Sequence, residues 1–151
     1  MAEHTKRKPR FDELSADECW EILSRNHVGR IAFVNQGYAD IEPVHYVAMD
    51  SWLFVRSAGG TKLEMFAHRP YVAFEVDESD ALFDWRSVVA RGTVYMMADS
   101  GARVDRAIFE KAVTSLRTLI PETLGDDDPT PMRRQVYGIH VDEMTGRSAH
   151  T

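Results

Sequence analysis

Three β-rich segments separated by very short turns are the feature that most constrains the fold of this chain. Val28–Val34 is followed by the hairpin signal Asn-Gln-Gly at positions 35–37. Tyr38–Met49 is followed by a second tight turn, Asp-Ser at positions 50–51, and then by Trp52–Ser57. Strands joined by turns this short must run antiparallel. The sequence therefore predicts a mainly β domain that contains an antiparallel meander.

The remaining patterns add peripheral helices and further strands. Ser15 and Glu18 form a capping box that starts a helix ending near Asn26. Further along the chain we expect a helix over Thr61–His68, strands over Tyr71–Val76 and Arg86–Met97, a helix over Val104–Leu119 and a last strand over Gln135–Asp142. We interpret Asp77–Asp84 as a loop and Thr145 as the start of a tail. Six strands with few helices predict a closed or nearly closed antiparallel barrel.

Within these segments, alternation predicts which side chains face the core. In the strand Tyr71–Val76, the side chains of Val72, Phe74 and Val76 share one face. In the long strand that follows, Gly92 indicates a bulge or a close approach of another backbone. The run Asp126–Asp128 lacks the ligand spacing of an EF-hand, and we interpret it as a solvated loop.

The composition restricts the class of protein. A length of 151 residues fits one domain, and 44% hydrophobic residues are enough to build a core. We assign residues 1–10, with the basic run Lys6–Arg10, to a disordered tail, and residues 11–151 to the domain. The formal net charge of -6 argues against a nucleic-acid-binding surface, which needs a clustered basic patch.

Several classes of site and location are excluded by what the sequence lacks. The single cysteine, Cys19, cannot form an intramolecular disulfide and fits a reducing compartment. No apolar run resembles a signal peptide or approaches the roughly 20 residues that span a bilayer, so we expect a cytoplasmic protein without a membrane segment. The histidines form neither HxH nor HExxH, and GxSxG is absent, so neither a metal site nor a serine hydrolase is expected.

A phosphate-binding loop is the main functional candidate. The strand ending at Arg56 and Ser57 is followed by Gly59-Gly60 and then by a helix that opens with Thr61 and Lys62. Glycines let backbone N–H groups turn toward an anion, and a helix N-terminus adds unpaired donors. Arg56 and Lys62 add charge, and Ser57 and Thr61 add hydroxyl groups. The alternative is an ordinary turn, and the spacing is not that of a P-loop.

Two aromatic side chains have both a structural and a functional interpretation. His45 lies in the middle of a predicted strand, where it is either a core or interface histidine or a residue beside a bound ring. Trp85 lies at the entry to another strand, where it is either a packing anchor or one wall of a pocket for a planar cofactor.

Taken together, the segments resemble the flavin-binding split-barrel superfamily, the pyridoxamine 5'-phosphate oxidase-like proteins. The similarity runs through Val28–Ala32, Glu42–Tyr46, Leu53–Ser57, Gly60–Lys62, Pro70–Val76, Trp85–Gly92 and Thr145–Arg147. The small subgroup that contains nitroimidazole-resistance proteins is the most similar in length. The chain differs from true pyridoxamine phosphate oxidases because it lacks their C-terminal segment that grips the substrate phosphate.

The resemblance implies a six-stranded split barrel that forms a homodimer, with FMN in clefts between the subunits. It implies that Arg56, Ser57, Thr61 and Lys62 bind the FMN phosphate and ribityl chain. It also implies that Pro43, Val44, His45 and Tyr46 lie along the isoalloxazine ring, with Trp85, Ser87 and Val88 near the same cleft, from the same or the partner subunit.

Three functions follow from this resemblance as hypotheses. The first is an FMN-dependent oxidoreductase that takes hydride from a reduced nicotinamide and reduces a small acceptor such as a nitroaromatic or a quinone. The second is a non-catalytic module that binds flavin or haem, for which His45 and His68 are candidate haem contacts. The third is a deazaflavin-dependent reductase, in which Arg30, Arg86 and Arg91 would form a basic groove.

Overall fold

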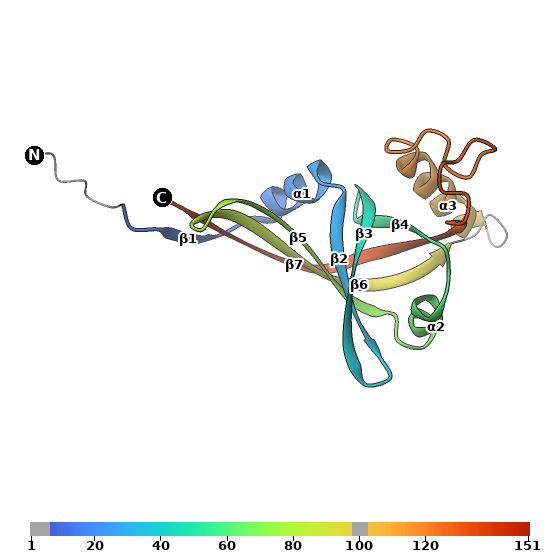
Figure 1. Cartoon of the computed structure of the whole chain (residues 1–151), viewed down its shortest axis with the longest axis horizontal. Helices are drawn as coiled ribbons and strands as arrows, with labels where there is room; N and C mark the ends of the chain where they lie inside the picture. The colour runs from blue at the N-terminus through green and yellow to red at the C-terminus, as the bar shows by residue number, and fades with distance from the viewer. Residues whose placement is uncertain (1–6, 98–102) are drawn as a thin grey trace, which may run out of the picture.

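The strands of this protein close into an antiparallel ring, with the helices outside it (Figure 1). The computed structural model describes residues 7–97 and 103–151, without the side chains of 61 and 103–105. The elements are β1 (Arg10–Glu13), α1 (Ala16–Arg25), β2 (Val28–Asn35), β3 (Tyr38–Met49), β4 (Trp52–Ser57), α2 (Thr61–His68), β5 (Tyr71–Ala81), β6 (Asp84–Met97), α3 (Arg103–Leu116) and β7 (Gln135–His150). No helix in the described part of the chain is long and apolar enough to cross a membrane.

The ring contains six strands, as predicted. Its order is β7-β4-β3-β2-β5-β6, and pairing of β6 with β7 closes it. The short strand β1 pairs with the last residues of β7, Arg147–His150, so it extends the sheet as a seventh strand outside the ring. Sequence patterning missed this strand, and Arg10, which we assigned to the tail, is its first residue. The predicted tail residues 1–6 lie outside the described part of the chain.

The two tight turns of the meander form as predicted. β2 pairs with β3 along its whole length, from Val28 opposite His45 to Asn35 opposite Tyr38. The turn between them uses Gln36 and Gly37 with φ of 50° and 82°, a region that glycine adopts readily. Between β3 and β4, Asp50 takes φ of 53°. These turns fix the register that brings the inward side chains of β2, β3 and β4 together.

The core fills the inside of the ring. Val72, Phe74 and Val76 are all buried, which confirms the predicted alternation.

Helix α1 begins with the predicted capping box, in which the Ser15 hydroxyl accepts from the Glu18 N–H at 3.2 Å. Gly92 lies at a register shift between β6 and β7, where a Cβ atom would stand 2.1 Å from the carbonyl oxygen of His140. Both predictions for Gly92 are therefore correct.

A predicted loop and a predicted tail are strands instead. Asp77–Asp84 was expected to be a loop, but residues 77–81 continue β5 and pair with β6. Thr145 was expected to start a tail, but β7 continues to His150 between β6 and β1. In Figure 1 these extensions form the long arm that reaches away from α2 and α3. Pairing with β6, and for residues 147–150 also with β1, stabilises strands whose polar composition does not predict them.

Ion pairs from distant segments compensate the acidic residues of this arm. The carboxylate of Glu78 accepts from Arg25 at 2.5 Å, from the Asn26 side chain at 2.7 Å and from Arg86 at 3.1 Å. The hydrogen bond from Arg25 is the main cause that lowers the pKa of Glu78 to about 2, and the bonds from Asn26 and Arg86 add to it against the opposing effect of burial.

The low pKa of Glu78 predicts a loss of stability in acid. Its folded pKa lies below the ordinary 4.5, so its contribution to stability is complete above pH 4.5 and is lost as the pH falls toward 2. Urea unfolding at a series of pH values should show the unfolding free energy falling across this window, and less steeply in Glu78→Gln. Glu64→Gln, at an exposed carboxyl, is the control and should keep the wild-type slope.

Candidate functional site

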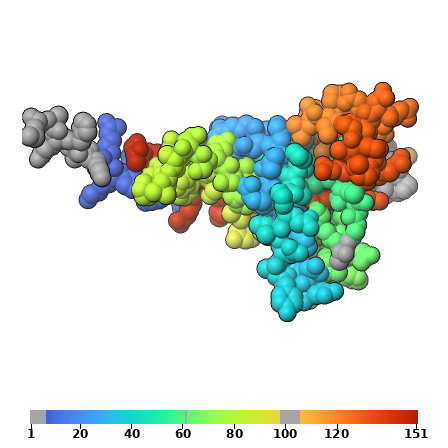
Figure 2. All heavy atoms as spheres, viewed as in Figure 1, coloured from blue at the N-terminus to red at the C-terminus, as the bar shows by residue number. Residues whose placement is uncertain are grey.

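A cleft of about 610 Å³ lies between β3, the end of β4, the start of α2 and the segment before β7. Its lining residues are Val28, Glu42, Pro43, Val44, His45, Arg56, Ser57, Ala58, Gly59, Lys62 and Arg133. These chain segments meet on the face shown in Figure 2, where the blue-to-cyan hairpin β2–β3, the green region of α2 and the orange-red segment before β7 adjoin. Most of the residues that we predicted to bind a cofactor are therefore together.

The turn before α2 has the backbone geometry of an anion-binding loop. Gly59 and Gly60 have φ of 97° and 109°, which side-chain-bearing residues rarely adopt. Gly60 is the N-cap of α2 and supplies no side-chain cap, and the Gly59 N–H is 3.3 Å from the Ser57 hydroxyl oxygen. The first turn of α2 therefore has donors for an anion. Thr61 begins α2, but its side chain lies outside what the structure describes.

Lys62 supplies the positive charge next to this turn. Its side chain is 14% exposed, and Nζ lies 2.7 Å from a carboxylate oxygen of Glu42 on β3. Nζ also lies 6.0 Å from the centroid of the Tyr137 ring. The Tyr137 hydroxyl is buried and has no hydrogen-bond partner among the described residues. Burial, with the charge of Glu42, raises the pKa of Tyr137, so the hydroxyl stays protonated.

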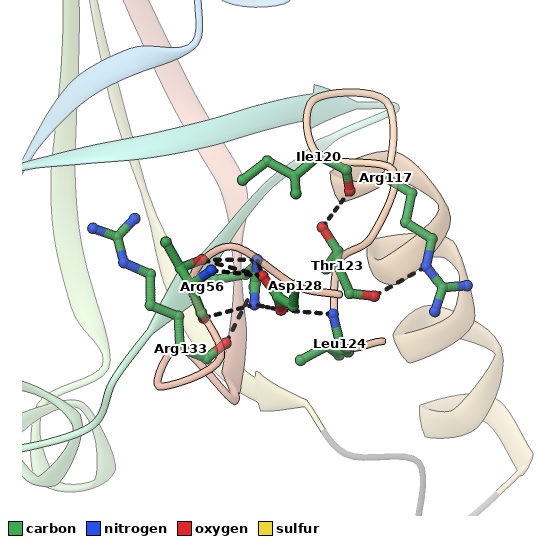
Figure 3. A network of polar contacts seen from close by, with 8 residues as sticks. Arg56, Arg117, Ile120, Thr123, Leu124, Asp128 and Arg133 are labelled. Atoms are coloured by element: carbon green, nitrogen blue, oxygen red, sulfur yellow. Dashed lines mark hydrogen bonds and ion pairs between the residues drawn. The ribbon is translucent and has the colours of Figure 1, made fainter. Parts of the chain in front are cut away.

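Arg56 is already paired within the protein (Figure 3). Its guanidinium forms a buried ion pair with Asp128 and donates to the Thr130 hydroxyl at 3.3 Å and to the Arg133 carbonyl at 3.1 Å. The side chain lines the cleft, but its charge anchors the segment before β7. A role for Arg56 at a phosphate stays a prediction.

Asp128 corrects the interpretation of the acidic run as a solvated loop. Its side chain is buried, whereas Asp126 and Asp127 are exposed. Burial acts to raise the pKa of Asp128, but hydrogen bonds from Arg56 and from the backbone of Thr130 and Leu124 outweigh it, and the pKa is about 2. The sequence prediction failed because the partner of Asp128 lies on a distant strand.

Arg133 is a second cation that sequence reasoning missed. It is half-buried, lines the cleft, and in Figure 3 its guanidinium points away from the Arg56 network. No ion pair within the described part of the chain involves it. Its only signal in the sequence is its place just before a strand, and the pairing of β4 with β7 is what brings it to the cleft.

The β3 edge of the cleft is formed by Pro43, Val44 and His45, and their contact with a flavin ring stays a prediction. The next residue, Tyr46, differs because its ring is fully buried and its hydroxyl donates to the Leu23 carbonyl at 2.6 Å. The Tyr46 side chain therefore ties β3 to α1 on the core side of the strand. A contact of Tyr46 with a cofactor stays a prediction.

Trp85, Ser87 and Val88 are absent from the described lining of the cleft. Trp85 lies on the arm, with its ring centroid 6.3 Å from that of Phe11 on β1. Ser87 pairs with Arg147 of β7, and Val88 is fully buried in the core. A single chain does not bring these residues to the other predicted site residues.

The buried pair of Arg56 with Asp128 should be required for the position of the segment before β7. Asp128→Asn removes the charge but keeps the shape, so it leaves the buried guanidinium of Arg56 uncompensated. We expect the melting temperature to fall by several degrees and limited proteolysis within residues 117–134 to become faster. Asp127→Asn, at the exposed neighbour, should change neither, and equal behaviour of the two variants would contradict this role.

Comparison with known proteins identifies the family. A family model described as pyridoxamine 5'-phosphate oxidase matches residues 15–148. An FAD-binding protein from Mesorhizobium loti is 26% identical, with a TM-score of 0.73 over 93% of this chain and 99% of that one. An FAD- and haem-binding protein from Mycobacterium smegmatis is 14% identical, with a TM-score of 0.68 over 92% of this chain and 74% of that one. A Bacteroides thetaiotaomicron protein assigned to 5-nitroimidazole antibiotic resistance is 16% identical, with a TM-score of 0.66 over 95% of this chain and 89% of that one. The last two show the fold alone, and the family match shows that this chain belongs to the pyridoxamine 5'-phosphate oxidase family, with its split-barrel fold.

Proposed function

We propose that this protein is a flavin-dependent oxidoreductase that binds FMN in the cleft between β3 and α2. The observation that carries the proposal is the meeting of an anion-binding turn, a lysine and a flat strand edge in one cleft of a chain from this family. A volume of about 610 Å³ is within the usual range for cofactor and ligand sites. The flavin-binding neighbour from Mesorhizobium loti supports the same class of cofactor.

The phosphate end of the cofactor fits the turn before α2. Backbone N–H groups after Gly59 and Gly60 and the ammonium group of Lys62 would bind the phosphate oxygens. Lys62 is held by the half-exposed Glu42, so the phosphate would compete with that carboxylate. The buried Tyr137 hydroxyl, which lacks a partner among the described residues, is a further donor beside Lys62.

The ring end of the cofactor fits the edge formed by Pro43, Val44 and His45. Bound flavin would supply hydride and electron transfer, which this chain's side chains cannot perform. The protein's part is to orient the ring, to exclude water from one side of it and to donate hydrogen bonds. We propose a reduced nicotinamide as donor and a small nitroaromatic or quinone as acceptor.

The deazaflavin alternative has less support, because the arginines proposed for its acidic tail are already paired. Arg30 contacts Glu75 and Asp77, Arg86 contacts Glu78, and Arg91 contacts Glu143. FAD and haem remain alternatives, since the Mesorhizobium loti and Mycobacterium smegmatis neighbours bind them. His45 lines the cleft, whereas His68 is exposed at the far end of α2.

The absorption spectrum of the purified protein tests the cofactor. We expect a yellow protein with the visible absorption bands of an oxidised flavin, which releases FMN on denaturation and oxidises reduced nicotinamide when an acceptor is present. Mass spectrometry of the released compound separates FMN, FAD, deazaflavin and haem. A colourless protein that binds no added flavin would contradict the proposal.

The role of Lys62 predicts opposite effects of two substitutions. Lys62→Ala removes a charged hydrogen bond worth about 1.5–3 kcal/mol, so the Kd for FMN should rise by roughly 10- to 150-fold. Glu42→Gln removes the competing carboxylate and should lower the Kd. Lys111→Ala, which breaks the exposed pair with Asp50, is the control. Titration of flavin fluorescence gives each Kd, and an unchanged value for Lys62→Ala would exclude Lys62 from the phosphate site.

A homodimer is proposed because it would let the arm of one chain reach the cleft of another. Trp85 and Ser87 lie on this arm. Large apolar side chains are exposed on the sheet, among them Phe11, Tyr38, Ile41 and Tyr71, and Leu82 is exposed in the turn between β5 and β6. Light scattering coupled to size exclusion should give twice the chain mass of 17.2 kDa. Monomers that bind FMN fully would contradict this assembly.

A further inference from the structure

A second cavity adjoins the cleft and is assigned no function by the family or by the sequence. It has a volume of about 420 Å³ and lies between the β2–β3 region and the end of α3 with the segment that follows it. Its lining residues are His27, His45, Arg56, Leu116, Leu119, Ile120, Thr123, Thr130 and Arg133. His45, Arg56 and Arg133 line both spaces, so an occupant of one would neighbour an occupant of the other.

The wall formed by α3 and its continuation is apolar. Leu116, Leu119 and Ile120 supply aliphatic surface. The polar groups on the same wall are already bonded within the protein: the Thr123 hydroxyl donates to the Ile120 carbonyl at 2.6 Å, and Thr130 accepts from Arg56. A ligand that placed polar atoms against this wall would lose their hydration without gaining partners. The body of a suitable ligand is therefore apolar.

Of the two arginines that line the cavity, one has no carboxylate partner among the described residues. Arg56 is neutralised by its buried pair with Asp128. Arg133 contacts no carboxylate within ion-pair distance among the residues that the structure describes, and it is half-buried at the boundary between the two spaces. A guanidinium in this position binds a carboxylate or a similar anion more strongly than it binds a neutral group.

We propose that this cavity binds a small aromatic molecule that carries one anionic group, with its ring against Leu119 and Ile120 and its anion at Arg133. The role of this molecule as the reaction partner of a flavin rests on the proposed function, whereas its binding to the cavity does not. The volume suits a single ring with one or two substituents. The apolar wall and the single charge together indicate this kind of ligand, and neither feature does so alone.

The probe for this site is 4-(trifluoromethyl)benzoate, with 4-(trifluoromethyl)benzamide as its neutral match. Fluorine NMR titrations are run on the protein as purified and after saturation with FMN. We expect the benzoate to bind at least fivefold more tightly than the amide. Arg133→Gln should remove this preference, whereas Arg134→Gln, at the exposed neighbouring arginine outside the cavity lining, should retain it.

Filling the cavity tests its location. Ile120→Trp, at a half-buried position, should abolish benzoate binding and leave the Kd for FMN within twofold. Leu119→Trp is the second filling variant, used if the melting temperature shows that the first does not fold. No binding of the benzoate, equal binding of the amide, or binding unaffected by a folded filling variant would each overturn the inference. Failure to bind FMN with intact benzoate binding would overturn the proposed function alone.

Discussion

Strand β7 is the element on which both the closed sheet and the candidate site depend. It pairs with β6 to close the ring, with β4 inside the ring and with β1 outside it. The register of β4 and β7 puts Arg56 opposite Val136. The residues just before β7 must therefore pass the end of β4, which brings Asp128 and Arg133 to Arg56. One backbone pairing thus positions cations that are far apart in the sequence.

Arg56 and Lys62, which seemed equivalent in the sequence, have different roles in the structure. The ion pair of Arg56 is almost wholly buried, so removing its partner leaves a desolvated charge. The ion pair of Lys62 differs, because its carboxylate partner Glu42 is 43% exposed and therefore keeps part of its contact with water. Arg56 therefore acts mainly through the position of the segment before β7, and of these two cations Lys62 is the one whose carboxylate partner is open to solvent.

Local patterning predicted the parts of the fold in which side-chain chemistry and backbone conformation agree. The capping box of α1, the turns at Gly37 and Asp50 and the bounds of α2 are all set by neighbouring residues. Patterning failed on residues 77–81 and 145–150, because these polar strands are stabilised by partners on β6 and β1 and by Arg25 of the distant helix α1. Local propensity carries no information about such partners.

The sequence by itself determined the antiparallel meander, the six-stranded barrel, the glycine turn before Lys62 and the strand edge formed by Pro43–His45. The meander, the barrel and the glycine turn follow from period-two alternation, turn chemistry and helix capping, which act over a few residues, whereas the edge formed by Pro43–His45 was implied by the family resemblance. Only the tertiary structure decided that Asp128 neutralises Arg56, that Arg133 lines the cleft and that Trp85 lies away from it. The reason is physical: each of these outcomes depends on which strands pair and on how much water each charge keeps, and both are properties of the closed ring.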